Sequence, residues 1–155
     1  MGKQKKIRFN LQEVDGASFS GETVWAEQLE GDQYRLMNIP FDISGYAEGD
    51  IVRCEPDEWG EWDEVKEIVL DSGNGTIRLL FGLGPHEEAQ QKVLSELVSV
   101  GCTYERASEK FVAVTVPPTL DVPFSQLSNF LNGLSGGVLA GWEVAKPMKR
   151  LNEKS

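Results

Sequence analysis

Residues 55–64, EPDEWGEWDE, concentrate the side chains that could do chemistry. Six of these ten residues are carboxylates, two are tryptophans and none is basic. Carboxylates can hold a cation, act as general acid and base, or attract a positively charged partner. The spacing lacks the ligand pattern of a calcium loop, and nothing in the sequence positions a carboxylate pair for glycoside hydrolysis. A solvated turn and a partner-binding surface therefore stay open as the two interpretations of this stretch.

The remaining candidates for catalysis do not form a set. His86 is the single histidine, and Cys54 and Cys102 lie far apart in the sequence, so no zinc spacing and no nucleophile–base pair can be assembled. The G-x-G at residues 82–84 precedes a predicted helix and could receive an anion, but two glutamates follow it directly. We therefore expect no enzyme, no metal and no cofactor, and we expect both cysteines to be reduced and structural.

The charge of the chain is concentrated in its first half. The net charge is −10; residues 1–75 carry 17 acidic and 7 basic side chains, whereas residues 76–155 carry 8 of each. Such a field repels phosphate backbones and anionic membranes and attracts basic proteins, although it would also serve solubility alone. No apolar run approaches the roughly 20 residues that span a bilayer, and no apolar segment follows the basic start. We expect a cytoplasmic protein that binds neither nucleic acid nor membrane.

The elements that must position the acidic stretch are strands. Alternating apolar residues predict a small antiparallel β-barrel or strongly curved sheet over residues 1–72, with Gly60 in the turn of a hairpin whose tip is the acidic stretch. The predicted strands are residues 5–11, 22–29, 32–41, 50–56 and 62–73.

The second half changes to a mixed pattern. Strand, helix, strand, strand, helix and strand follow one another, which predicts an α+β fold with a ferredoxin-like βαββαβ arrangement over residues 73–148. Pro85 suits the first turn of the first helix, and Gly101 suits its C-terminal cap. The residues after 148 are expected to fray, and the short join at residues 71–76 predicts that the two halves pack as one unit. The predicted segments are strand 76–84, helix 85–101, hairpin 102–118 turning at Ser108 and Glu109, helix 122–137 and strand 138–147.

Three motifs in residues 22–52 carry a resemblance. They read E-x-x-W-A-E from Glu22, Y-R-L-x-N-I-P-F from Tyr34, and G-D-x-V from Gly49. The chain resembles a family of small uncharacterised bacterial proteins known as a domain of unknown function, and more loosely it resembles immunity proteins of contact-dependent inhibition and related toxin systems. The family implies a bacterial cytosolic module, and it has no established catalytic residues to carry over to this chain. Trp25 and Phe41 are expected to fill the first core, and Pro40 to fix the chain as it leaves the sheet.

Together these observations predict an immunity protein that neutralises a cognate toxin, most simply a basic nuclease, through an acidic surface anchored by tryptophan. The alternative is a small-molecule-binding or regulatory module built on the ferredoxin-like half. A monomer or weak dimer is expected. The predicted partner-binding residues are Glu55, Asp57, Glu58, Trp59, Glu61, Trp62, Asp63 and Glu64.

Overall fold

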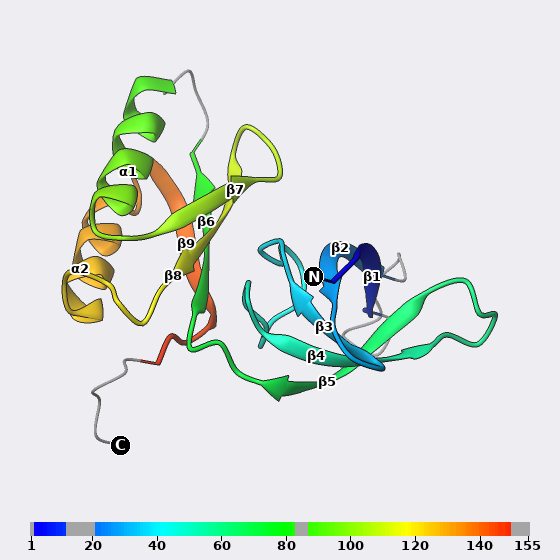
Figure 1. The fold of residues 1–155 in the computed structure, drawn as a ribbon. Coiled ribbons are helices and arrows are strands. Elements are labelled where there is room, and N and C mark those ends of the chain that lie inside the picture. The colour runs from blue at the N-terminus through cyan, green and yellow to red at the C-terminus, as the bar shows by residue number, and fades with distance from the viewer. Residues whose placement is uncertain (1, 12–20, 83–86, 150–155) are drawn as a thin grey trace. The chain divides into compact units, whose positions relative to one another are not determined.

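The computed structural model describes residues 2–11, 21–82 and 87–149, and the chain divides into two compact units (Figure 1). The first unit is Met1–Ser72 and the second is Gly73–Ser155. Among the described residues, the first unit contains strands joined by loops and no helix, and the second combines strands with helices, so the α+β class is confirmed. The expectation that the two halves pack as one body stays a prediction.

Five strands form the first unit. Each pairs with the next in antiparallel fashion, and β1 meets β5 through a parallel bridge between Arg8 and Glu64, which closes the sheet into a barrel. The third strand ends five residues earlier than expected, because the chain after Leu36 leaves the sheet into a loop with two glycines of positive φ, Gly45 and Gly49. The strands are β1 Gln4–Asn10, β2 Gly21–Gln28, β3 Gln33–Leu36, β4 Ile51–Pro56 and β5 Asp63–Leu70.

The barrel core follows from alternation along the strands. Successive side chains of a strand point to opposite faces, so every second residue of β1 to β4 faces inward. Trp25 lies between two inward residues of β2 and is therefore turned outward, with 45% of its surface exposed. Phe41 is half-buried and is not part of the core, so the prediction that these two aromatic residues fill the core is wrong. The buried core residues are Ile7, Phe9, Val24, Ala26, Tyr34, Leu36, Val52 and Cys54.

The second unit is a four-stranded sheet with two helices. The strand order is β7-β8-β6-β9, every neighbouring pair is antiparallel, and both helices lie on the same side of the sheet (Figure 1). One apolar cluster joins the inward residues of the sheet to the buried stripes of the helices. The elements are β6 Gly75–Phe81, α1 Glu87–Ser99, β7 Thr103–Arg106, β8 Phe111–Val116, α2 Phe124–Leu134 and β9 Leu139–Lys146.

The ends of the helices explain their lengths. Gly101 has a φ of 110°, its N–H bonds the carbonyl of Val98 and the N–H of Cys102 bonds the carbonyl of Leu97, which is the predicted glycine cap of α1. Helix α2 begins after Pro123, two residues later than predicted. Pro85, His86 and most of the G-x-G segment lie outside the described residues, as does the predicted frayed tail beyond Lys149.

Both cysteines are free and buried. Burial raises the pKa of the Cys54 thiol to about 12 and that of Cys102 to about 11, because the charged thiolate is poorly solvated there. We therefore expect almost no reaction of the native protein with a disulfide reagent at pH 8, and two equivalents of reaction after denaturation. Reaction of either thiol in the native protein at the rate of a free cysteine would show that its site opens to solvent.

Candidate partner-binding hairpin

The acidic stretch forms the tip of the hairpin that joins β4 to β5. Asp57 organises the tip: its N–H bonds the carbonyl of Trp62 at 2.8 Å, and its carbonyl accepts the N–H of Gly60 at 3.1 Å. Its side chain closes the turn, because Oδ1 accepts the backbone N–H of Glu61 at 2.8 Å and that of Trp59 at 3.2 Å. Gly60 has a φ of 71°, which confirms it as the turn residue. The tip is thus held by its own hydrogen bonds.

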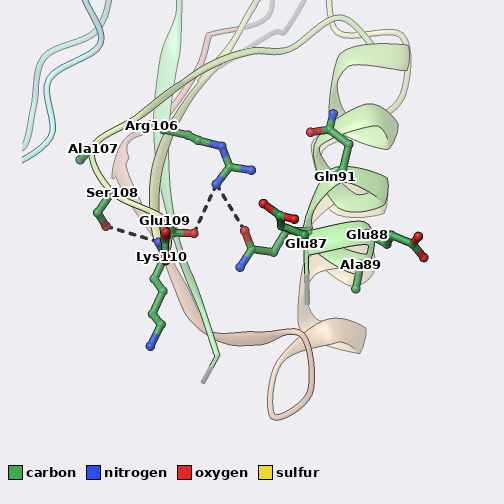
Figure 2. A pocket seen from close by; sticks show the side chains of 10 residues that line it. Glu87, Glu88, Ala89, Gln91, Arg106, Ala107, Ser108, Glu109 and Lys110 are labelled. Carbon is green, nitrogen blue, oxygen red and sulfur yellow. Dashed lines mark hydrogen bonds between the residues drawn. The ribbon is translucent and has the colours of Figure 1, made fainter. Parts of the chain in front are cut away.

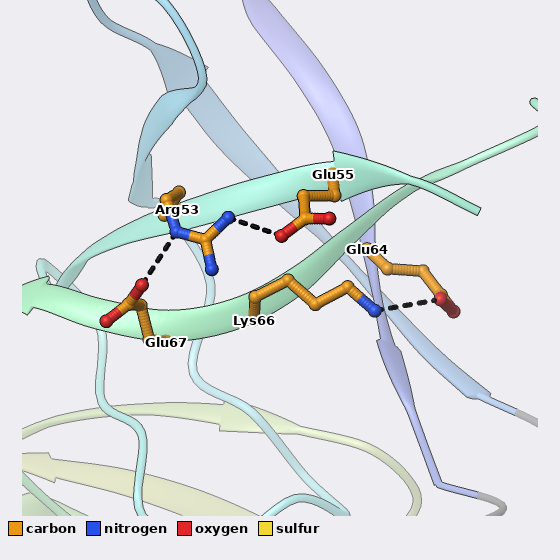
Figure 3. A network of polar contacts seen from close by, with 5 residues as sticks. All are labelled: Arg53, Glu55, Glu64, Lys66 and Glu67. Carbon is orange, nitrogen blue, oxygen red and sulfur yellow. Dashed lines mark hydrogen bonds and ion pairs between the residues drawn. The ribbon is translucent and has the colours of Figure 1, made fainter.

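Two of the predicted carboxylates are occupied by basic neighbours along the strands (Figure 3). Arg53 donates from Nη1 to Glu55 at 2.5 Å and from Nε to Glu67 at 2.7 Å. The hydrogen bond from Arg53 lowers the pKa of the Glu55 carboxyl, so Glu55 stays ionised but paired. Glu64 is buried and lies 3.6 Å from the ammonium of Lys66. Both carboxylates are paired, Glu64 in a buried position and Glu55 with 52% of its side chain exposed.

A third carboxylate ties the hairpin to the barrel. Asp63 Oδ2 accepts hydrogen bonds from Lys5 Nζ at 2.5 Å and from the Tyr34 hydroxyl at 3.1 Å. The hydrogen bond with Asp63 raises the pKa of Lys5, while desolvation first and Asp63 second raise that of Tyr34. Asp63 thus links β5 to β1 and β3, and its charge is largely compensated.

The accessible part of the stretch is smaller than the sequence suggests. Trp59 is 75% exposed, and Glu58 and Glu61 are exposed and form no ion pair within the part of the chain that the structure describes. Trp62 is half-buried. We call Glu58, Trp59 and Glu61 the tip surface: one indole flanked by two unpaired carboxylates on a hydrogen-bonded turn.

The hydrogen bonds at the tip predict a titration. Although desolvation raises the pKa of Asp57, the backbone N–H groups that it accepts outweigh this and lower the pKa below its ordinary value. A lowered folded-state pKa means that the turn gains stability above the unfolded pKa and loses it as the pH falls through the folded value. In an acid titration followed by NMR, the amide protons of Trp59 and Glu61 should therefore shift with a midpoint below that of an ordinary aspartate. A midpoint at or above the ordinary value would contradict the turn geometry.

The polar residues of the motifs turn out to anchor the loop between β3 and β4. The buried carboxylate of Glu22 accepts the N–H groups of Phe41, Asp42 and Ile43 at 2.6, 3.0 and 3.0 Å. Asn38 Oδ1 accepts the N–H of Trp25 at 2.8 Å. These roles were not predicted, although Glu22 occupies the same inward-facing row of β2 as Val24 and Ala26, and a carboxylate at such a position must find hydrogen-bond donors.

Asp50 anchors the same loop from its other end. Its side chain is fully buried and accepts the N–H of Ala47 at 2.9 Å, the N–H of Ser72 at 2.9 Å and the hydroxyl of Ser72 at 2.8 Å. It therefore connects the end of β5 to the loop before β4. These motif positions therefore hold the loop between β3 and β4 in place.

A hollow of about 1180 Å³ lies between the start of α1 and the turn that joins β7 to β8 (Figure 2). Arg106 Nη1 spans it, donating to Gln90 Oε1 and to the carbonyl of Glu109, each at 3.3 Å. The lining carries both signs of charge, with Glu87 and Glu88 on the helix and Lys110 on the turn. Such a hollow, lined by charged and polar side chains, is suited to a small polar molecule.

The described residues contain neither a cluster of metal ligands nor a membrane-spanning helix. Within residues 2–11, 21–82 and 87–149, no three histidine, cysteine, aspartate or glutamate side chains lie together as a metal site would require. Over the same ranges, no helix has the length and apolar content to cross a bilayer.

Comparison with known proteins identifies a family and a fold. The profile of a domain of unknown function, DUF4265, matches residues 22–142, which confirms the resemblance to a small uncharacterised family. A crystal structure of a hypothetical protein from Neisseria gonorrhoeae has a TM-score of 0.72 at 18% identity, with 96% of each chain covered. At that identity the likeness shows the fold alone. A comparison with curated proteins finds no match.

Proposed function

This chain belongs to the DUF4265 family, and we propose that it is a stoichiometric binding protein whose tip surface engages a basic site on another protein. The observation that carries the proposal is Trp59, which is 75% exposed on a turn held by hydrogen bonds. An exposed tryptophan on a hydrogen-bonded turn can bury a large area on binding, and it has only two side-chain torsions to order.

The flanking charges complement the anchor. Glu58 and Glu61 stand on either side of Trp59 without ion pairs in the described residues, in a half-chain whose excess of acidic side chains extends the same field. Such a field speeds the encounter with a basic surface and selects against acidic ones, while the indole supplies the affinity. The tip surface is therefore suited to a partner with a basic rim around an apolar pocket.

The specific form of the proposal is an immunity protein. A toxic nuclease needs a basic cleft to hold phosphates, and an acidic hairpin with an apolar anchor can occupy that cleft or its border. This would block the substrate without any chemistry by the inhibitor. The proposed compartment is the cytoplasm, where the free thiols of Cys54 and Cys102 would remain reduced.

The test is calorimetry, at low and at high salt, with any toxin-like domain that is found encoded beside this chain. We expect one-to-one binding that weakens as salt rises, since part of the attraction is between exposed charges. Binding that is equally tight at both salt concentrations would move the interface away from the tip surface. Absence of binding would overturn the immunity proposal.

A second candidate rests on the hollow beside α1. The strand order β7-β8-β6-β9 with two helices on one side supports a ferredoxin-like arrangement, and the hollow of about 1180 Å³ is large enough for a metabolite. In this case the protein would be a regulatory module. A small molecule that copurifies and is released by Arg106→Ala, but not by Trp59→Ala, would favour this candidate over the first.

A further inference from the structure

The barrel carries a second exposed aromatic site on its outer face. Trp25 on β2 pairs with Lys6 on β1, and its carbonyl accepts the N–H of Met37 at 2.9 Å. The indole and the Met37 side chain are 45% and 39% exposed. The Lys6 ammonium lies 5.3 Å from the centre of an indole ring. We call Lys6, Trp25 and Met37 the platform: one cation beside two neighbouring apolar side chains.

Hydrogen bonds hold the backbone of the platform. The N–H of Trp25 donates to Asn38 Oδ1 at 2.8 Å, and its carbonyl accepts the N–H of Met37. Both backbone groups are thus fixed, although the ring itself is turned away from the barrel core. Single exposed apolar residues are common on protein surfaces. Two adjacent ones, with an ammonium over the ring, make a small preorganised contact area.

The platform and the tip surface are complementary in chemistry. The platform offers an ammonium, an indole and a thioether, and the tip surface offers an indole and two carboxylates. Indole–indole and thioether–indole contacts are favourable, and Lys6 is matched to Glu58 or Glu61. Trp59 is 75% exposed, so the tip surface does not rest on the platform of its own chain.

We propose that two copies of this chain associate weakly, with the tip surface of each docked on the platform of the other. A two-fold arrangement makes both contacts at once and closes, whereas a head-to-tail arrangement would propagate into chains. The contact area is small, so association is expected at high protein concentration and decreases with salt. In such a dimer both tip surfaces are covered.

The inference uses the tip surface of the proposed function but does not depend on that function. Dimer formation would compete with a basic partner for Trp59, so the free protein would be partly self-masked until a tighter partner arrives. Variants of the platform distinguish dimerisation from binding of a basic partner, because Lys6 and Trp25 take part only in the proposed dimer contact. Lys6→Glu should weaken dimerisation and leave affinity for a basic partner unchanged or slightly higher.

The experiment is sedimentation velocity of the full chain from micromolar to millimolar concentration. The wild type should shift from monomer to dimer, and Trp59→Ala and Lys6→Glu should each weaken dimerisation by about tenfold or more. Leu70→Ala is the matched control, because Leu70 is 60% exposed on β5 of the same unit and belongs to neither surface. Circular dichroism of each variant verifies that the barrel is folded.

Mixing two charge-reversed variants gives the decisive result. Glu58→Lys with Glu61→Lys reverses the tip surface and Lys6→Glu reverses the platform, so each variant alone brings like charges together, whereas their equimolar mixture brings opposite charges together in both contacts. We expect the mixture to associate more strongly than either variant alone. A wild type that stays monomeric at millimolar concentration, or a mixture that associates no better than its components, would overturn the proposal.

Discussion

Replacing Asp50 with alanine is expected to lower the free energy of unfolding of the first unit by about 3 kcal/mol. The Asp50 carboxylate is fully buried and accepts three hydrogen bonds, two from backbone N–H groups and one from the hydroxyl of Ser72. Alanine would leave the buried N–H of Ala47 and the half-buried N–H and hydroxyl of Ser72 without that acceptor; a buried donor left unpaired costs about 1–3 kcal/mol, and the donors of Ser72 cost less because water reaches them. Urea unfolding followed by tryptophan fluorescence measures the effect, since three of the four tryptophans lie in the first unit.

Two variants make this result specific. Asp50→Asn keeps one acceptor oxygen but turns an N–H₂ toward one of the donors, so it should be destabilised less than Asp50→Ala. Asp32→Ala removes an exposed carboxylate of the same unit and should leave the unfolding midpoint almost unchanged. Equal midpoints for Asp50→Ala and Asp32→Ala would mean that the loop is not anchored by Asp50.

Replacing Trp59 with alanine is expected to weaken binding of the proposed basic partner by about 2 kcal/mol, or roughly 30-fold in Kd. The indole is the largest exposed apolar group on the hairpin, and Asp57 fixes the backbone of the turn that carries it. Because the side chain is 75% exposed, its loss should not change the stability of the barrel. Titration calorimetry of wild type and variant with the same partner measures the difference.

A matched pair of variants distinguishes anchoring from general surface effects. Trp59→Phe keeps an aromatic ring and should recover part of the affinity. Leu70→Ala removes an exposed apolar side chain from the same strand pair and should have no effect on Kd. If Trp59→Ala bound the partner as tightly as wild type, the tip surface would not be the interface.

The elements of the fold could be predicted because the physical signal is local. Alternation of apolar residues identified all five strands of the barrel, and the change to helical spacing identified α1 and α2. Gly60 and Gly101 were placed correctly because only a residue without Cβ adopts positive φ readily. These features depend on neighbours within a few positions, so the sequence contains them.

The errors concern which face of a strand a side chain occupies. Trp25 was expected in the core because tryptophan is large and apolar, but Val24 and Ala26 on either side of it are buried, and the pleat then turns Trp25 outward. Size favours burial only where the register permits it. The exposed platform is the consequence of this register.

The position of the candidate site in the sequence could be predicted, but which of its carboxylates are paired could not. Spacing alone cannot show that Arg53 pairs with Glu55, or that Lys5 reaches Asp63 across 58 positions of sequence. Only the folded barrel brings these groups together, and among the described residues it leaves Glu58 and Glu61 exposed without an ion pair beside the exposed Trp59. The eight predicted residues thus divide into those that hold the hairpin and those that can meet a partner.

The central claim is that the tip surface meets a basic partner, and the most direct measurement is the association rate of two charge-reversed variants. Glu58→Lys with Glu61→Lys changes the tip, and Glu87→Lys with Glu88→Lys makes the same change in net charge on exposed residues of α1. We predict that the tip variant associates with the partner domain at least about tenfold more slowly at low salt, because steering acts near the contact, and that the α1 variant changes far less. Equal rates for the two variants would contradict the account.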